Sequence, residues 1–434
     1  MNPTRHLSDD IASRRHRSAA ILPPAFMRDS RLQYLLTFAM LGTVLPYVSV
    51  FFRSAGLAET QIGLAYAIWS LAAVLSPAVA TMAADGKVDP RRLLALSSVI
   101  TAACLLCLGL VRGVGPILCV WTGYCLASMP LFALQDGIHF SQQRRRRDLG
   151  QPAIAYHLVR VWGTIGYLIP SVSLFAFLRA GMNLRIVLMT GAGFALLAAA
   201  QSTRLLDPRS HDPREAEQEA GADRQIPTLQ ALTTILGPRL LAFCAAVVLM
   251  DVAAQIHSAF YPLYLTARVG LSQEWLGAAS GLSVAVEAAI IFSCGWLIRG
   301  LGIKRLMLLA TLATAVRFGL IGLWTTVWVA MGTQVLHGLL VMATNVLPQT
   351  VFDEQAGDGF RHSMQGVFVM LASGGQAVGN LVAGRLAAHG LHHVFLCAVA
   401  LCAAASCLIL FGFREPARRE HEPLQTSELV PGIP

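Results

Sequence analysis

The sequence QIGLAYAIWSLAAVLSPAVATMAADGKVDPRRLLALSSVITAACLLCLGLV (residues 61–111) holds two apolar segments joined by one short charged loop. Each segment is about 20 residues long, which is the length that a helix needs to cross a bilayer. The pattern predicts two consecutive membrane-spanning helices, near 61–83 and 92–111.

The same pattern recurs along the whole chain. The apolar segments lie near 32–52, 61–83, 92–111, 115–140, 155–178, 184–203, 239–265, 274–298, 305–324, 326–348, 362–387 and 391–413. The 434 residues are 55% hydrophobic and 13% charged, whereas roughly 25% of the residues of a soluble protein are charged. The composition excludes a soluble enzyme, a nucleic-acid-binding protein and a disordered chain. We expect an all-α integral membrane protein with twelve transmembrane helices.

The distribution of basic residues predicts the orientation. With the N-terminus inside, the cytoplasmic stretches hold 25 Arg and Lys residues and the external loops hold five. Positive charge accumulates on the cytoplasmic side of membrane proteins. We therefore expect both termini in the cytoplasm. The arginine-rich, lysine-poor usage is typical of GC-rich bacteria and indicates a multi-pass protein of the inner (plasma) membrane.

One long hydrophilic stretch, 204–238, interrupts the spans and divides them six and six. Its mixed charge and lack of aromatic residues predict a flexible cytoplasmic linker. The expected organisation is an N-terminal tail (1–31), a six-helix half (32–203), this linker, a second six-helix half (239–413) and a C-terminal tail (414–434).

The two halves also resemble each other in sequence. A shift of 214 residues places Gly63 on Gly277 and Arg91 on Arg305, without a gap and within similar apolar surroundings. Duplicated six-helix halves are typical of transporters whose halves rock about a central binding site. We expect two pseudo-symmetric halves.

With these two halves, the chain resembles the major facilitator superfamily. The loop between spans 2 and 3 carries Asp85, Arg91 and Arg92, which are similar to the acidic and basic positions of that superfamily's Gly-x-x-x-Asp-Arg-x-Gly-Arg-Arg loop. The resemblance implies that these residues form a loop that switches between conformations.

A sharper resemblance is to the branch that contains lactose, nucleoside and phenylpropionate permeases. The stretch YHLVRVWGTIGY (156–167) is similar to its span 5 signature, and Glu287, Arg317 and His337 match its polar positions in spans 8, 9 and 10. The resemblance to this branch implies proton symport. Lactose permease has a proton-coupling Glu where this chain has Leu340, so the route of the proton does not carry over directly.

Four ionisable residues lie deep in predicted spans of the C-terminal half. Asp251, Glu287 and Arg317 are each 12 residues from a charged helix edge, which places them about 18 Å into the membrane. His337 lies near the same depth. A charged group there costs about 2.5–3.5 kcal/mol, so we expect the four groups to meet in one layer, with Glu287 paired to Arg317.

Two interpretations of this layer stay open. The pair is either structural, setting helix register, or it exchanges partners as proton and solute bind. On the second interpretation Asp251 or Glu287 carries the proton and His337, which titrates in the right range, relays it. Glu287, Arg317, His337 and Asp251 are therefore the candidate proton-coupling residues.

The N-terminal half contributes a candidate solute site. Asp136 and Arg160 lie at similar depth on spans 4 and 5, where they can pair. By resemblance they are the substrate-contact residues of the branch, and Tyr167 is similar to the aromatic ring on which sugars stack. Arg160 or Arg317 would attract a carboxylate solute.

Together these features predict a proton-coupled symporter that imports a small polar or anionic organic solute, namely a sugar, a nucleoside or an aromatic acid such as phenylpropionate. The alternative on the same fold is a drug or metabolite efflux antiporter. A membrane-embedded enzyme or a sensor is the alternative from another class. We expect no cofactor, no metal and no nucleic acid. The expected partners are the solute, protons and the lipid bilayer, and we expect a monomer.

Overall fold

The computed structural model describes residues 25–85, 88–148, 151, 156–205, 233–237 and 240–413, and this part of the chain is helical, without strands. The helices of its first half are α2 (Ala25–Val44), α3 (Val48–Ser54), α4 (Glu59–Asp85), α5 (Pro90–Leu110), α6 (Val114–Ser128), α7 (Pro130–Asp148), α8 (His157–Arg179) and α9 (Arg185–Ser202). Those of its second half are α12 (Leu241–Ala267), η1 (Gln273–Trp275), α13 (Leu276–Leu301), α14 (Ile303–Leu323), α15 (Val327–Gly332), η2 (Thr333–Leu336), α16 (His337–Val341), η3 (Met342–Val346), α17 (Leu347–His389), α18 (Leu391–Cys407) and η4 (Leu408–Gly412).

Twelve helical stretches of the described chain are long and apolar enough to cross a membrane, from Met27–Ser54 to Leu391–Gly412. Each overlaps one predicted segment. The fourth and tenth, Val114–Arg144 and Val327–Phe352, run four residues past the predicted ends. The prediction of an all-α integral membrane protein with twelve spans is confirmed.

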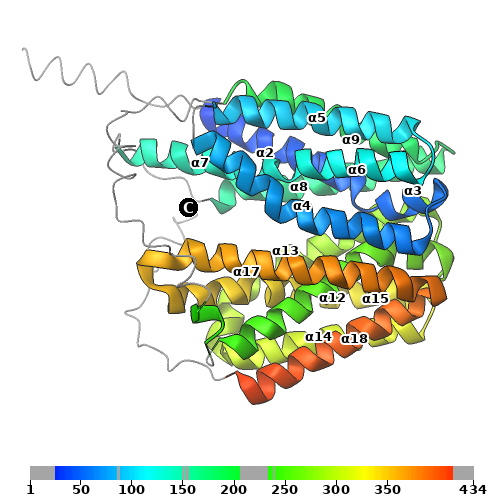
Figure 1. Cartoon of the computed structure of the whole chain (residues 1–434), viewed down its shortest axis with the longest axis vertical. Helices are drawn as coiled ribbons and strands as arrows, with labels where there is room; N and C mark the ends of the chain where they lie inside the picture. The colour runs from blue at the N-terminus through cyan, green and yellow to red at the C-terminus, as the bar shows by residue number, and fades with distance from the viewer. Residues whose placement is uncertain are drawn as a thin grey trace, which may run out of the picture.

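The helices form two bundles, blue to green and green to red in Figure 1. In the first bundle α2 packs against α8 and α9, and in the second α18 packs against α12 and α14. The bundles meet where α4 contacts α17 and where α8 contacts α13. Residues 1–24 of the expected N-terminal tail, the whole C-terminal tail and most of the expected linker lie outside the described residues, whereas the last seven residues of the N-terminal tail belong to α2. Their boundaries and the cytoplasmic position of the termini therefore stay predictions.

Glycines allow the two bundles to touch at the end that carries the predicted external loops. A Cβ on Gly63 would lie 2.8 Å from the Cα of Gly384, and a Cβ on Gly277 would collide with the carbonyl oxygen of Ser171. The backbone N–H of Gly277 also donates to the hydroxyl of Tyr47 at 3.1 Å. The bundles are therefore closed against each other at this end.

Several spans contain a break or an irregular turn. The first span breaks between α2 and α3 around Pro46, and the fourth breaks before Pro130. Proline lacks an N–H and clashes with the preceding turn, which favours a break at these positions, whereas Pro77, Pro170 and Pro262 lie inside continuous helices. The tenth span passes through a 3₁₀ turn, a short α-helix and a π-turn around His337. Such irregular turns within helices often mark functional positions.

The glycine contacts generate the first prediction. Replacing Gly277 by Ala forces Ser171 and its helix away, so this variant should populate the closed external end less than the wild type. Spin labels placed one on each bundle at this end, in a background without the nine free cysteines, would report a longer distance. Gly281→Ala is the matched control, because its Cβ would meet Leu168 at an ordinary 3.5 Å. An unchanged distance in Gly277→Ala would contradict the steric argument.

The start of α5 generates a pH-dependent prediction. Burial acts to raise the pKa of Asp89, but hydrogen bonds from Arg91 and the charges of Arg91 and Arg92 outweigh it and hold that pKa below its ordinary value. Asp89 also caps the helix by accepting from the backbone N–H of Arg91 at 2.9 Å. The carboxylate therefore stabilises the fold above its unfolded pKa of about 3.9, and this contribution is lost as the pH falls through the lower folded pKa.

Asp89→Asn keeps the cap and removes the charge. Thermal unfolding in detergent should show this variant less stable than wild type by about 0.5–1 kcal/mol near pH 7. The difference should shrink towards about pH 3. A difference that is the same at both pH values would assign the effect to the cap alone.

Candidate functional site

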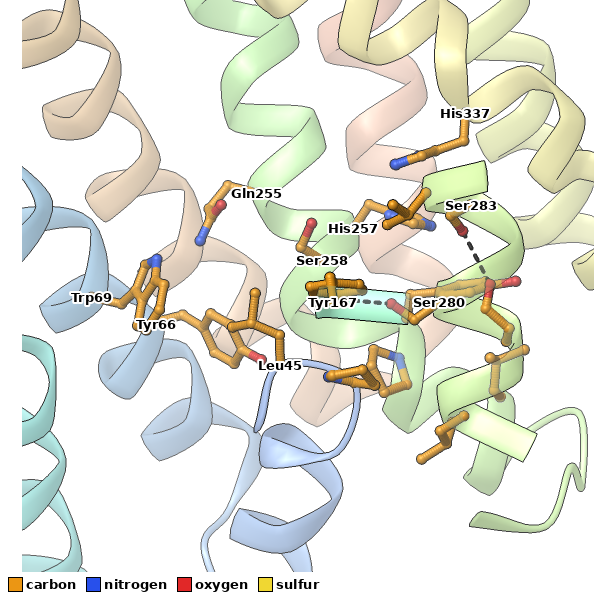
Figure 2. A pocket seen from close by; sticks show the side chains of 17 residues that line it. Leu45, Tyr66, Trp69, Tyr167, Gln255, His257, Ser258, Ser280, Ser283 and His337 are labelled. Atoms are coloured by element: carbon orange, nitrogen blue, oxygen red, sulfur yellow. Dashed lines mark hydrogen bonds between the residues drawn. The ribbon is translucent and has the colours of Figure 1, made fainter. Parts of the chain in front are cut away.

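A cavity of about 220 Å³ lies between the two bundles. Figure 2 shows aromatic, hydroxyl and imidazole side chains converging on it from both halves. Its lining consists of Leu45, Pro46, Tyr66, Trp69, Tyr167, Gln255, His257, Ser258, Tyr261, Pro262, Leu265, Leu276, Ala279, Ser280, Ser283, Val284 and His337. None of these residues is acidic. We call this space the central cavity.

The first bundle supplies aromatic walls. Tyr66 and Trp69 of α4 line one side (Figure 2), and Trp69 stacks on Trp121 with ring centroids 5.8 Å apart. Tyr167 of α8 crosses to the second bundle, where its hydroxyl and that of Ser280 lie 2.8 Å apart. The predicted aromatic residue Tyr167 therefore lines the cavity, at the contact between the halves.

The second bundle buries a cation directly behind the cavity wall. Arg317 of α14 is 0% exposed. Its guanidinium donates to Gln334 Oε1 at 2.7 Å and approaches His337 Nδ1 at 2.9 Å and His257 Nε2 at 3.1 Å. Within the described chain no carboxylate forms an ion pair with Arg317. Its partners are therefore neutral acceptors, and its charge is not compensated.

The arginine determines how both histidines are protonated. A guanidinium has only donors, so each imidazole nitrogen that faces it must be an acceptor. The remaining nitrogens, His337 Nε2 and His257 Nδ1, then carry the hydrogens of the neutral rings. His257 Nδ1 is buried and has no hydrogen-bond partner in the described structure. Both histidines line the central cavity, so a positive charge lies directly behind this part of its wall.

The expected Glu287–Arg317 pair is wrong for this conformation. Arg317 faces His257, His337 and Gln334, whereas the cation that acts electrostatically on Glu287 is Arg160 of the first bundle. Sequence spacing predicts a depth along each helix but not the rotation of the helix about its own axis. Because rotation decides which neighbour a side chain meets, equal depth was not sufficient for pairing.

Asp136 and Arg160 do not form a direct pair either. Asp136 accepts hydrogen bonds from the hydroxyls of Tyr34 and Tyr156, the latter at 3.1 Å. The Arg160 guanidinium lies over the ring of Phe38, 4.0 Å from its centroid. Both residues lie outside the lining of the central cavity. Their role in solute binding stays a prediction.

Asp251 lies in a different cavity, so the four ionisable groups do not meet in one layer as expected. This second cavity, of about 260 Å³, is also lined by Thr344, Asn345, Gln365 and Gln376, among others. The physical reason is again helix rotation, since Asp251 and His257 lie on the same helix, α12, but face different spaces.

The loop between spans 2 and 3 is only partly described. The side chain of Asp85 lies outside the described residues. Arg91 is held by Asp89, at 2.9 Å, and by the carbonyl oxygen of Leu205, at 3.0 Å. Arg91 therefore ties this loop to the end of the sixth span. Asp89 was missed as its acidic partner, although an Asp before a Pro at a helix start is a capping signal.

Sequence reasoning also missed His257, Gln334 and Tyr261 as members of the cluster. Gln334 receives hydrogen bonds from Arg317 and Ser283 and donates to the Tyr261 hydroxyl at 2.7 Å. Their signal was a polar side chain inside an apolar span. That signal is ambiguous without structure, because a polar residue in a span is satisfied by any neighbour within reach.

The uncompensated arginine generates the third prediction. Gln334→Glu places a carboxylate at the existing 2.7 Å contact, so Arg317 gains a counter-ion and the thermal stability should rise by about 1.5–3 kcal/mol. Gln255→Glu is the matched control, because it adds the same charge to the cavity wall away from this contact and should destabilise. Thermal unfolding of both variants measures the difference. A Gln334→Glu variant less stable than wild type would mean that Arg317 is already compensated.

The comparisons with known proteins agree with this architecture. The sequence matches the MFS_1 like family over residues 29–397. It is 27% identical over 370 residues to the probable 3-phenylpropionic acid transporter of Escherichia coli, covering 84% of this chain and 92% of that protein. It is 22% identical over 372 residues to the xanthosine permease of Escherichia coli, covering 82% and 85%.

Solved structures share the fold. A mutant form of the nucleoside transporter NupG superposes with a TM-score of 0.79 at 20% identity, covering 90% of this chain and all of that one. A bacterial homologue of the human lysosomal transporter Spinster, inward-facing and unoccupied, gives 0.67 at 16% identity, covering 91% and 96%. With a family match over most of its length and twelve spans, the chain belongs to the MFS_1 like family and is a multi-pass inner-membrane transporter of the major facilitator superfamily.

Proposed function

We propose that the protein imports a small aromatic carboxylate together with protons, by alternating access of the central cavity. One observation carries the proposal, namely the buried cation Arg317, which has no carboxylate partner among the described residues. An anionic solute would supply the missing negative charge. Solute binding would then offset a burial cost that the protein alone leaves unbalanced.

The geometry of the cluster supports a carboxylate in particular. Arg317 itself lies behind the wall, while His337 and His257 face the cavity. The N–H of His337, polarised by the arginine, would donate to a carboxylate oxygen. Hydrogen bonds to an ionised acceptor are about twice as strong as those between neutral groups. The serine hydroxyls of α13 provide further donors beside this position.

The opposite wall supports an aromatic ring. Tyr66, Trp69 and Tyr167 present flat apolar surfaces, and aromatic pairs gain about 0.5–1.5 kcal/mol beyond area burial. The cavity volume of about 220 Å³ is below the ~300–1,000 Å³ that is usual for drug-sized ligands. The size therefore favours a small solute over the cargo of a drug efflux antiporter. Import is also the direction that the permease names of the relatives suggest.

A nucleoside is the second candidate. Gln255, Ser258 and Ser280 offer neutral hydrogen-bonding groups beside the aromatic walls, and two of the relatives are named as xanthosine and nucleoside permeases. A neutral nucleoside would, however, leave Arg317 without a counter-charge. The aromatic carboxylate is therefore the preferred candidate solute.

We propose Glu287 as the proton carrier. Glu287 of α13 lies close enough to Arg160 and Tyr167 of α8, in the opposite bundle, to interact with them electrostatically. A carboxylate at the contact between the halves pairs with the opposite bundle only when it is ionised. Protonation would therefore weaken one conformation and couple the proton to alternating access. Asp251, in its separate cavity, is the other candidate carrier, and His337 is the proposed relay.

The test uses purified protein, reconstituted in either orientation in liposomes that contain a pH-sensitive dye. Addition of 3-phenylpropionate should acidify the lumen faster than in empty liposomes, which report the leak of the neutral acid. Uridine is the competing solute. Glu287→Gln should abolish the acidification, whereas Glu274→Gln, at the start of the same span, should not. Gln334→Glu should lose uptake of the carboxylate while keeping its fold.

The possible outcomes test the solute, the proton coupling and the carrier residue separately. Acidification with uridine but not with 3-phenylpropionate would favour the nucleoside function. Movement of labelled carboxylate without protons would contradict proton coupling and keep the solute assignment. Loss of acidification in Asp251→Asn but not in Glu287→Gln would move the carrier to the second cavity.

A further inference from the structure

A second buried polar cluster lies in the first bundle, apart from the central cavity. Asp136 of α7 accepts hydrogen bonds from Tyr34 of α2 and from Tyr156. His139 follows Asp136 by three residues, which places both on one face of α7. The His139 ring centroid lies 6.3 Å from that of Tyr34 and 5.7 Å from that of Tyr156. An imidazole therefore lies beside the two phenols that hold the Asp136 carboxylate.

His139 lacks hydrogen bonds that its burial requires. The residue is 2% exposed, and neither of its ring nitrogens has a hydrogen-bond partner in the described structure. The side-chain oxygens of Gln33 and Gln135 are buried without a partner as well. An unmet buried donor or acceptor costs about 1–3 kcal/mol. Such atoms, gathered in one place, indicate a bound molecule that satisfies them.

The space between these groups has the size of one water molecule. A cavity of about 10 Å³ is lined by Tyr34, Gln33, Gln135 and His139, with Ser30, Ile138, Gln142 and Leu205 completing it. A polar cavity of about 10–15 Å³ with two to four polar partners is sufficient to hold one water. Ser30 and Leu205 lie at the end of the bundle that carries the linker, on the predicted cytoplasmic side.

We propose that this cavity holds one water, and that Asp136, Tyr34, this water and His139 form a relay that releases the coupled proton to the cytoplasm. The inference rests on the proton coupling of the proposed function and adds a route that the central cavity does not provide. The ligand of the site is water, and His139 is the group that passes the proton on.

The relay balances at each step. Protonated Asp136 gives its proton to the Tyr34 oxygen while the Tyr34 hydroxyl gives its own proton to the water. The water gives one of its hydrogens to the acceptor nitrogen of His139. The other ring nitrogen, which is also buried, gives its proton to a second water that enters from the cytoplasmic end. Tyr34, the water and His139 then have the charge with which they started, and Asp136 is left as a carboxylate. One proton has moved from the carboxylate to the solvent.

The charged surroundings of His139 suit a transient cation. The titratable groups that face it are Tyr34 of α2, Asp136 of α7 and Tyr156 at the start of α8. Arg160 acts on Asp136 and Tyr156 electrostatically, and its guanidinium lies over Phe38. The nearest ionisable acid is therefore Asp136, which is negative once it has given up its proton.

The test compares net uptake with exchange in proteoliposomes. Net symport requires the proton to leave the carrier on the inside, whereas exchange of labelled for unlabelled solute returns the carrier with its proton still bound. His139→Phe keeps an aromatic ring in this position but cannot carry a proton. It should slow net proton-coupled uptake at least tenfold and change the exchange rate less than twofold. His389→Phe, at the exposed end of α17, is the control and should change neither rate.

A second variant addresses the water and guards against misfolding. Gln135→Leu removes one of the water's partners and leaves His139 in place, so it should also slow net uptake more than exchange. Equal loss of net uptake and exchange in both variants would assign the cluster a structural role and overturn the relay. Normal net uptake in both would overturn it as well. A wild-type protein that moves solute without protons would contradict the coupling itself, which is a different result.

Discussion

The buried charge of Arg317 is the constraint on which the rest of the site depends. A guanidinium in the interior of a membrane protein is costly, and this one is surrounded by two imidazoles and an amide in place of a carboxylate. Neutral acceptors take hydrogen bonds from its two terminal nitrogens, but its Nε has no partner among the described residues and its charge has no counter-ion. The arrangement keeps an attraction for anions at the wall of the central cavity, and it determines the protonation of both histidines.

The tenth span is irregular where it contacts Arg317. Gln334 and His337 must both reach Arg317 from one helix, three residues apart, while Leu340 beyond them remains buried. A 3₁₀ turn ends just before His337, and a π-turn follows Val341. These changes of helical pitch alter the direction of successive side chains. The span thus presents Gln334 and His337 to the arginine, and beyond them it continues as a packed helix.

The polar groups of the two bundles have different surroundings. In the second bundle a cation lies behind the cavity with neutral partners, and in the first an acid, Asp136, is held by two phenols. Tyr167 and Ser280 connect the bundles at the contact between them. This difference supports the proposal that the second bundle attracts the anion and the first conducts the proton. Closure through glycine contacts at the predicted external end would separate the two events in space.

The sequence by itself determined the twelve spans, because apolar length is dictated by the thickness of the bilayer and needs no neighbour to be read. It also identified Arg317, His337 and Tyr167 as residues of interest, since polar groups in apolar spans are visible in one dimension. Only the tertiary structure decided which of them meet. Glu287 and Asp251 do not meet Arg317, because the rotation of each helix is set by packing against several helices at once. His257, Gln334 and His139 acquire their meaning from the same packing, since a buried polar group is defined by what surrounds it.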